Sequence, residues 1–477
     1  MGGGKQHPGF PNPNPTVSHW QDPPHRLASH RTTPELPTDE AWDHVIIGSG
    51  ISGAAIAHKL LTRKPLLRVL MLEARTAASG ASGRNGGHCR PGWWSHFRRY
   101  AASFGEAEAL RLERHEEQTV ADVAAFVREH GVRNDFQDVE TADVFTTDAA
   151  FRGALDALAF RDEVRARTPG DVGPSVERTV WRAEDARARL GIPGIAGAIT
   201  YPAHAQNPYL LVCRMLELAL DAGLNLQTNT PALSVEEEEE EETADGDGAK
   251  WTVRTERGAV RARNVVLATN AYTNSLYRGL AATGFLTPAR SQVAALRPGS
   301  GMDYGYLTGH SGGPVDVPTD DYYMTTPAGV VVWGGGRCLA PGREVGVTDD
   351  GAVDGAVAAY LHDAPRHFYG AERWGRSGGE DGGAEVVRDW SGITCYTPDT
   401  LPLVGQAPGQ PGLWMSVGMN GHGMALAFRC AEALVHMLIE GKGEPPEWFP
   451  RSMRLARAWE APKLRVEGWV EGTGGVV

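Results

Sequence analysis

One stretch constrains this chain more than any other. Over residues 44–75 an apolar strand runs into a glycine-rich turn, an alanine-rich helix and a second apolar strand that ends in an acid. In a dinucleotide site of GxGxxG spacing, Gly48 allows a tight turn, Gly50 lets the backbone approach a pyrophosphate, and Gly53 lets the helix pack on the strand. The free N–H groups that open the helix point at the phosphates. The alternative is an ordinary glycine-rich turn between a strand and a helix.

An acid stands where such a site needs one. Glu73 lies about 20 residues beyond Gly53, where its carboxylate can accept hydrogen bonds from an adenosine ribose. Residues 265–270 form another continuous apolar strand that ends in small polar residues, as buried parallel strands do. Strand, helix, second strand and acid together predict a nucleotide-binding α/β unit.

Length and charge limit the remaining choices. A chain of 477 residues predicts two or three domains. The net charge of -13 argues against nucleic-acid binding and against a basic membrane-binding face. Part of that charge is the glutamate run at 236–242, and we expect residues 236–248 to be a solvated hairpin loop. No apolar run approaches the roughly 20 residues of a membrane span.

The cysteines and the ends of the chain favour the cytosol. Five cysteines are scattered without CxxC spacing, which fits a reducing compartment and predicts no disulfide or metal framework. Residues 1–40 are rich in Pro, Gly and His, so we expect a flexible extension that is extended or disordered and buries little, although Trp20 can dock on the body. They contain no secretory signal, and residues 446–477 read as a tail without an address motif.

A second glycine-rich segment follows the acid. Residues 79–91, the cradle segment, contain four glycines and few side chains suited to a core. They form a surface linker or a backbone cradle for a bulky polar group, and their place after Glu73 favours the cradle.

The rest of the chain predicts helices, a meander and another glycine-rich turn. Helices are expected at 105–130, at 208–222 behind an Asn207 cap, and at 424–440 as a buried element. Residues 224–263 predict a β-meander, and residues 369–383 a mobile insertion. Glycine-rich strand-to-helix turns near residues 50 and 420 suit a long cofactor that is charged at both ends.

Five motifs occur in order: GSGISG with Glu73, SGRNGG, ATNAY, WSGITCYTPDTLPLVG and GMNGHGM. Together they resemble the FAD-dependent D-amino-acid oxidase/glycine oxidase superfamily, over about residues 20–445. The SGRNGGH form is similar to fungal-type relatives of gamma-glutamylputrescine oxidase.

The resemblance implies an α/β fold with a Rossmann-like FAD-binding domain in discontinuous segments, plus a substrate domain on a large, mostly antiparallel sheet. The FAD-binding domain would comprise residues 41–100, 200–280 and 391–445, and the substrate domain residues 101–199 and 281–390.

The resemblance also implies which residues hold FAD. The pyrophosphate would be held by Gly48, Gly50, Ile51, Ser52 and Gly53. Glu73 would bind the ribose, with Ala74 and Arg75 beside the adenosine. The pyrophosphate and flavin ring would be lined by Ser82, Gly83, Arg84, Asn85, Gly86 and Gly87. The backbone of Ala232, where the family usually has valine, would meet the adenine. The adenosine half would pass Ala268, Thr269 and Asn270.

The last motif contributes electrostatics. Gly421, His422, Gly423 and Met424 are expected to open the final helix, whose N-terminus stabilises nearby negative charge. Reduced flavin carries that charge around N1 and the C2 carbonyl, so the helix would favour hydride acceptance.

Covalent attachment of FAD is not expected. Arg84 stands where dimethylglycine-dehydrogenase-like relatives have the flavin-bearing histidine, and Gly392 aligns where sarcosine-oxidase-like relatives have cysteine. Cys395, three positions later, is the alternative attachment point.

The substrate face has four candidates: His88, Arg290, Tyr323 and Arg337, each of which can equally be structural. Glycine-oxidase-type enzymes clamp a carboxylate with tyrosine and arginine, which suits bidentate pairing by arginine. Trp93, Trp94 and Trp390 are read as core rather than as an amine cage, and Asp399 as a turn residue.

The leading hypothesis is oxidation of the C–N bond of a small-molecule amine or amino acid by hydride transfer to FAD. It gives an imine and, with molecular oxygen as the acceptor, hydrogen peroxide; the cofactor carries the chemistry. The alternatives are a dehydrogenase with another acceptor, a tailoring oxidase of secondary metabolism, and a non-catalytic flavin-binding scaffold.

Overall fold

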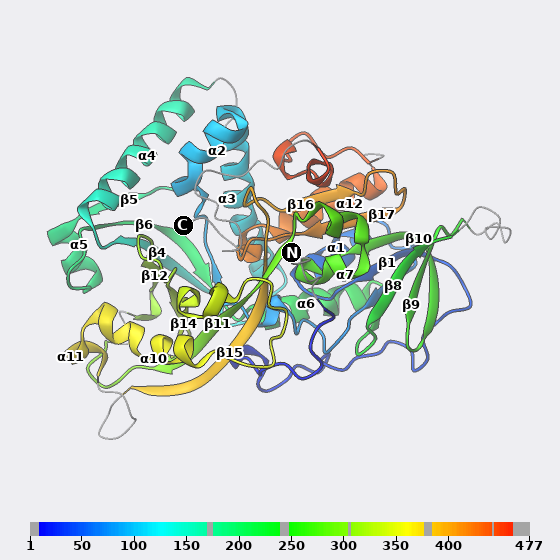
Figure 1. Ribbon diagram of the computed structural model, residues 1–477, viewed down its shortest axis with the longest axis horizontal. Helices are drawn as coiled ribbons and strands as arrows, with labels where there is room; N and C mark the ends of the chain where they lie inside the picture. Colours follow the sequence, from blue (N-terminus) through cyan, green and yellow to red (C-terminus); the bar gives the residue numbers. More distant parts are fainter. Residues whose placement is uncertain are drawn as a thin grey trace, which may run out of the picture.

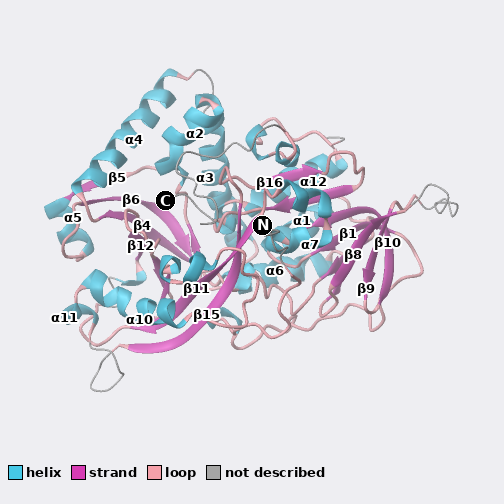
Figure 2. Cartoon of the chain, viewed as in Figure 1, coloured by secondary structure: helices cyan, strands magenta, loops and turns pink. Residues whose placement is uncertain are grey.

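The computed structural model describes residues 9–168, 175–238, 248–303, 307–375, 384–440 and 443–460. Two sheets of eight and nine strands organise them, each with helices packed on it. Figure 1 shows the smaller sheet with α1, α6 and α12 on the right and the larger sheet on the left; Figure 2 shows the same view by secondary structure. The α/β fold class expected from the sequence is confirmed.

The eight-stranded sheet is parallel at its centre, in the order β16-β17-β10-β1-β2-β7. Its parallel strands are β1 (Trp42–Ile47), β2 (Val69–Leu72), β7 (Asn225–Gln227), β10 (Gly258–Leu267) and β17 (Leu413–Val417). Three strands pair antiparallel: β8 (Ala232–Glu237), β9 (Trp251–Thr255) and β16 (Leu403–Gln406).

Helices bury both faces of this sheet. One apolar cluster joins it to α1 (Ile51–Arg63), α6 (Pro208–Asp221) and α12 (Ala427–Ile439). On the other face lie the short helices α7 (Thr273–Leu276) and α8 (Arg278–Thr283). Because both faces are covered, the central strands consist of nearly continuous apolar residues.

The nine-stranded sheet is antiparallel except where β4 pairs with β12. Its strands are β3 (His88–Cys89), β4 (Gln137–Phe145), β5 (Thr179–Arg182), β6 (Gly197–Ala205), β11 (Thr287–Arg297), β12 (His310–Pro314), β13 (Tyr322–Thr325), β14 (Val331–Gly334) and β15 (Glu385–Tyr396).

Helices also pack on both sides of the larger sheet. On one side lie α2 (Phe97–Phe104), α3 (Glu106–Glu129) and α4 (Asp148–Arg167), and on the other α5 (Ala183–Leu190), α10 (Gly355–Tyr369) and α11 (Ala371–Trp374) (Figure 1). Short 3₁₀ turns include η1 (His19–Gln21), η2 (Ala81–Gly83), η3 (Trp93–His96), η5 (Asn270–Tyr272), η6 (Arg337–Leu339), η7 (Pro341–Glu344), η9 (Gly423–Ala425), η10 (Arg451–Met453) and η11 (Leu455–Ala458).

Local sequence signals position several of these elements. Asn207 caps α6 by accepting a hydrogen bond from the Leu210 N–H at 3.1 Å, and Pro208 occupies the first helical position. The expected helix after Gly105 is confirmed as α3. The expected meander is wrong in one respect, because β7 joins the parallel sheet beside β2 while only β8, β9 and β10 pair antiparallel.

The N-terminal segment corrects another expectation. Residues 9–40 do not extend away from the body; Trp20, Leu27 and Leu36 are each under 7% exposed. Arg31 forms a β-bridge with Gln227 at the edge of β7. The segment buries more than its composition indicates, because Trp20, Leu27 and Leu36 dock, whereas Phe10 and Val17 stay exposed.

Some predictions lie outside the described residues. These include most of the glutamate run, the glycine-rich part of the 369–383 insertion, and the tail beyond residue 460. The domain boundaries given above stay a prediction. Within the described residues, the helices are all too short or too polar to cross a bilayer.

Candidate FAD and substrate site

Close backbone contacts explain the first glycine motif. Gly48 has a φ of +104°, and a Cβ on it would lie 2.8 Å from the Ala268 carbonyl oxygen. A Cβ on Gly53 would lie 1.9 Å from the Gly48 oxygen. The end of β1, the start of α1 and the end of β10 therefore meet at distances that only glycine permits, as a dinucleotide-binding turn requires.

The acid after β2 faces this turn. Glu73 is 8% exposed, and one carboxylate oxygen accepts hydrogen bonds from the Ser49 N–H at 3.0 Å and from its hydroxyl at 2.6 Å. The other oxygen accepts from the Arg75 N–H. The carboxylate thus lies beside the glycine turn at the end of the second strand, which fits a ribose-binding acid.

Two predicted neighbours of the adenosine have different surroundings. The Arg75 guanidinium is buried, forms an ion pair with Asp350 at 2.9 Å and donates to the Ser79 carbonyl at 3.1 Å. Its charge is therefore already compensated within the protein. Ala74 is partly exposed beside it.

The cradle segment packs against the start of α1. The Ser82 hydroxyl accepts a hydrogen bond from the Ile51 N–H at 2.8 Å, and a Cβ on Gly50 would lie 3.0 Å from that hydroxyl. Residues 82–84 and 86–87 are buried. Burial favours the cradle interpretation over the surface-linker one, because a linker would be exposed.

Arg84 ties the cradle segment to the larger sheet. Its guanidinium donates to the Ser79 carbonyl at 2.8 Å, the Ser391 carbonyl at 2.9 Å and the Thr16 hydroxyl at 3.1 Å. Burial lowers its pKa to about 10, so it stays a cation at neutral pH. A Cβ on Gly392 would lie 3.1 Å from the Arg84 Cβ. Arg84 and Gly392, the two positions that the sequence resemblance aligned with covalent flavin attachment, are therefore neighbours in space.

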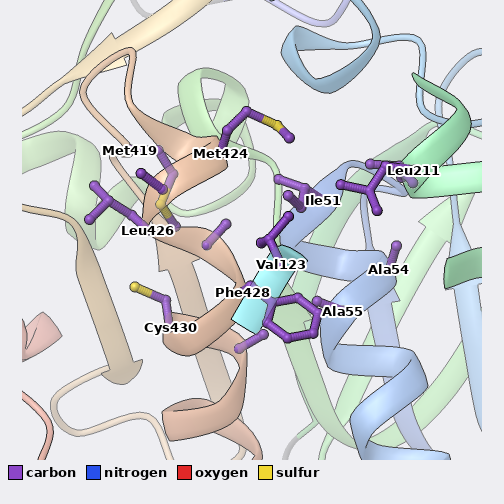
Figure 3. Close-up of a cluster of buried hydrophobic side chains, with 14 of the residues drawn as sticks. Ile51, Ala54, Ala55, Val123, Leu211, Met419, Met424, Leu426, Phe428 and Cys430 are labelled. Carbon is purple, nitrogen blue, oxygen red and sulfur yellow. The ribbon is translucent and has the colours of Figure 1, made fainter. Parts of the chain in front are cut away.

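The two glycine-rich turns meet across the molecule. Asn270, at the end of β10, accepts hydrogen bonds through its side-chain oxygen from the N–H groups of Gly418 and Met419, at 2.9 and 3.2 Å. Figure 3 shows Met419, Met424 and Leu426 in one apolar cluster with Ile51 and Ala54 of α1.

The final helix starts later than expected. Gly423 and Met424 belong to the short 3₁₀ turn η9, and α12 begins at Ala427. The turn precedes the helix because Leu426 leaves the helical conformation between them. Gly421 and His422 lie before both elements.

Three further residues that were predicted to contact FAD have these surroundings. Ala232 is buried in β8 opposite Thr255. The hydroxyl of Thr269 is 2.9 Å from that of Thr273. Asn85 donates from its side chain to the Ala81 and Ser82 carbonyls, which stiffens the cradle segment.

His88 faces the larger sheet. Its Nε2 lies 2.8 Å from the Ser311 hydroxyl and 3.2 Å from the Thr141 hydroxyl. Burial, with the charges of Arg90 and His422, lowers the pKa of His88 well below its ordinary value. The ring is therefore neutral at physiological pH and is held by two hydroxyls.

Tyr323, the predicted tyrosine, and its neighbour Tyr322 face opposite sides of the larger sheet. Tyr323 is 1% exposed and stacks on Trp333 at 5.2 Å in the core under α10, on the side of the sheet away from the cradle segment. Tyr322 points the other way: a Cβ on Gly86 would lie 2.4 Å from its ring. Successive strand residues face opposite sides, so the residue that faces the cradle is Tyr322.

Arg337 lies beside a second tyrosine, Tyr396. Its guanidinium is 4.9 Å from the ring centre of Tyr396, and a Cβ on Gly421 would lie 3.5 Å from the Tyr396 hydroxyl. The Nη1 of Arg337 is buried, and among the described residues it has no hydrogen-bond partner. Arg290 differs, because Glu344 and the Asp349 carbonyl bind its guanidinium.

Two tyrosines beside the predicted site residues, Tyr322 near Gly86 and Tyr396 near Arg337, were not among the residues predicted from the sequence. Strand alternation was the available signal for Tyr322, whereas nothing in the sequence marks Tyr396. Trp93, Trp94 and Trp390 are buried, as core residues are. Asp399 accepts from the Leu401 N–H, as a turn residue does, and its carboxylate also binds Arg457. A hollow of about 530 Å³ beside α5 and α11 contains none of the predicted site residues.

Comparison with known proteins agrees with this geometry. The chain is 27% identical over 443 residues to the tRNA 5-methylaminomethyl-2-thiouridine biosynthesis bifunctional protein MnmC of Paracidovorax citrulli, an alignment that covers 88% of this chain and 60% of that protein. The chain thus spans about three fifths of that relative. It is 24% identical over 420 residues to the glycine oxidase of Geobacillus kaustophilus, with 86% and 96% coverage.

A solved structure shares the fold. The L-proline dehydrogenase from P. horikoshii superposes with a TM-score of 0.67 at 19% identity, with coverage of 87% of this chain and 98% of that one. The family model described as DAO, FAD dependent oxidoreductase, matches residues 43–437. The glycine turn, the buried acid and the cradle segment fit the FAD that this model names, and the chain belongs to the FAD-dependent oxidoreductase family.

Proposed function

We propose that this protein oxidises the C–N bond of a small amine that carries a carboxylate, an amino acid or an N-substituted relative of one. FAD supplies the chemistry by accepting a hydride from the carbon beside the nitrogen. The product is an imine, and molecular oxygen takes up the electrons to give hydrogen peroxide. Glycine oxidase and L-proline dehydrogenase, the names of two similar proteins, support an amino-acid substrate.

The proposal that the substrate carries a carboxylate rests on Arg337. A buried cationic N–H group without a partner is costly, so such groups normally face an anion or water. The Nη1 of Arg337 is such a group, because it is buried and has no hydrogen-bond partner among the described residues. Tyr396 packs against the face of the same guanidinium. A substrate carboxylate would supply the missing acceptor, and the guanidinium fork matches it in a bidentate manner.

The residues around Arg337 would orient the substrate. Tyr322 and Tyr396 lie between the cradle segment and the loop at Gly421, and both side chains are partly exposed. Burial raises the pKa of Tyr322, so its hydroxyl stays protonated and can donate or accept a hydrogen bond. In this proposal Tyr322 replaces Tyr323 as the tyrosine on the substrate side.

We propose that FAD is held without a covalent bond. Arg84 and Gly392, which are neighbours, offer no nucleophile at either position. Cys395 is fully buried in an apolar cluster, and burial raises the pKa of its thiol. Because the thiolate is the reactive form, Cys395 is poorly suited to attack a flavin. Heating the holoprotein should release free FAD into the supernatant.

An amine panel tests the activity. Purified holoprotein is mixed anaerobically with glycine, sarcosine, proline, other amino acids and matched amines without the carboxylate, and loss of the flavin absorbance is followed. We expect bleaching by a carboxylate-bearing amine and peroxide release once air is readmitted. Bleaching without peroxide would indicate a dehydrogenase. A flavin that no amine in the panel bleaches would contradict the proposal and leave a scaffold role.

A further inference from the structure

Glu116 joins three parts of the site through one buried carboxylate. It lies on α3, and its side chain is 0% exposed. One oxygen accepts hydrogen bonds from the Gly92 N–H at 2.9 Å and from His422 Nε2 at 2.5 Å. The other oxygen accepts from the Trp93 N–H at 2.8 Å. A single helix residue thus holds both the two residues that follow the cradle segment and the loop before η9.

His422 lies in the loop before η9 and contacts this carboxylate through Nε2. It follows Gly421, which approaches the Tyr396 hydroxyl, and its ring stacks on Trp93 with centres 6.4 Å apart. Its side chain is 26% exposed, so water reaches the ring. Among the described residues Nδ1 has no hydrogen-bond partner, while Nε2 is held by Glu116.

The carboxylate fixes the tautomer of this imidazole. An ionised carboxylate only accepts hydrogen bonds, so Nε2 carries the proton and the lone pair of a neutral ring lies on Nδ1. The orientation of the Glu116 carboxylate is fixed, because two backbone N–H groups also donate hydrogen bonds to it. The negative charge also stabilises the imidazolium that forms when Nδ1 takes a proton, as in other carboxylate–histidine pairs.

We propose that Glu116 is a positioning residue that makes His422 the proton acceptor for the substrate. This inference rests on the proposed function, because hydride transfer requires a neutral amine. The ammonium N–H bond breaks and its proton binds Nδ1, leaving the nitrogen lone pair on the substrate. No electrons are exchanged in this step. The proton then leaves to water through the exposed edge of the ring.

Other charged or titratable groups surround the pair and contribute to its pH response. They come from β3, η3 and α2 and comprise His88, Cys89, Arg90, His96, Arg99 and Tyr100. Burial lowers the pKa of His96 to about 3, and the pKa of His88 is also lowered. Both rings are therefore neutral near pH 7 and do not compete with His422 for the proton.

The substitution Glu116→Gln tests the inference sharply. If the amide oxygen stays on the Trp93 N–H, the amide N–H₂ replaces the oxygen that Gly92 and Nε2 share and favours the tautomer with the proton on Nδ1. If the oxygen takes that shared position instead, the tautomer is kept but the negative charge that stabilises the imidazolium is lost. The rate of anaerobic bleaching is measured against pH with the amine that reduces the wild-type flavin. We expect a loss on the order of 10²-fold at pH 7, the scale of general base catalysis, that shrinks as the pH rises and disappears above the pKa of the amine, where the amine is already neutral.

Two further variants keep the outcome decisive. His422→Gln should show the same pH-dependent loss of the bleaching rate. This variant tests the inference even if Glu116→Gln fails to bind FAD. Glu108→Gln, on the same helix but bound to Ser452, should match the wild type at every pH. A loss of equal size at all pH values would reduce Glu116 to a structural role and overturn the inference. If no amine bleaches the wild-type flavin, it is the proposed function that fails.

Discussion

The indole N–H of Trp20 donates a hydrogen bond of 2.7 Å to the backbone oxygen of Asn85. Ser18, two residues earlier, donates through its hydroxyl to the Gly83 carbonyl at 2.6 Å. A Cβ on Gly87 would lie 3.0 Å from the Trp20 ring. The N-terminal segment therefore packs against the cradle segment and holds its backbone through hydrogen bonds.

Trp20→Phe should weaken FAD binding. The change removes the bond to Asn85, worth about 1 kcal/mol, and leaves a buried carbonyl without its partner. We expect the dissociation constant for FAD, measured by flavin fluorescence on reconstituted apoprotein, to rise about tenfold. Trp459→Phe is the matched control, because Trp459 is 37% exposed in the C-terminal part of the chain. Equal affinities in the two variants would show that Trp20 does not support the cofactor.

Gly53→Ala should abolish FAD binding while the chain still folds. Its Cβ would lie 1.9 Å from the Gly48 oxygen, so the turn between β1 and α1 must open. Gly153→Ala is the control: a Cβ there meets nothing within 4 Å in the exposed helix α4. Helix propensity predicts that Gly153→Ala raises stability by about 0.5–1 kcal/mol. The absorbance of bound flavin and the melting temperature distinguish the two cases, and a yellow Gly53→Ala protein would contradict the assignment.

Local patterns in the sequence predicted the nucleotide half of the fold well. Gly48, Gly53 and Glu73 follow a spacing whose physical cause lies within one βαβ unit, and the structure places all three at the same turn. Asn207 likewise marks the start of α6, because it caps that helix. Such features need no knowledge of distant residues.

Contacts between distant residues could not be predicted in this way. Arg290 is neutralised by Glu344, on the loop that follows β14, and no spacing rule reveals that pairing. Tyr322 and Tyr323 show a related limit, since a shift of one residue along a strand exchanges its two faces. Glu116 was passed over because it lies in an ordinary amphipathic helix, and only the packing of α3 brings it to His422.

Arg337→Met should raise KM for the carboxylate-bearing substrate by about 10²-fold, the scale of a lost charged hydrogen bond. The apolar chain still packs on Tyr396 but cannot pair with an anion. Steady-state peroxide release measures the effect, and KM for an amine without the carboxylate should hardly change. Arg297→Met, which removes an exposed pair with Glu385, is the control. An equal increase for both amines would argue against the carboxylate clamp.

Acid should destabilise the protein partly through His115. This side chain is 2% exposed between Trp448, Phe449 and Cys430, and its burial, with the charge of Arg429, lowers its pKa to about 3. The unfolded chain therefore binds more protons than the folded one between about pH 6.5 and pH 3, and stability falls as the pH falls through that window. At pH 5 the loss from this one group is about 2 kcal/mol.

Replacing His115 by methionine removes that contribution, because the apolar side chain has no proton to bind. We expect the melting temperature of His115→Met to fall less than that of the wild type between pH 7 and pH 5, by a few °C. His367→Met, at a side chain that is 77% exposed, should follow the wild type. If His115→Met and the wild type lost the same number of degrees, the acid sensitivity would have to come from the other buried histidines, such as His44, whose pKa burial lowers to about 4.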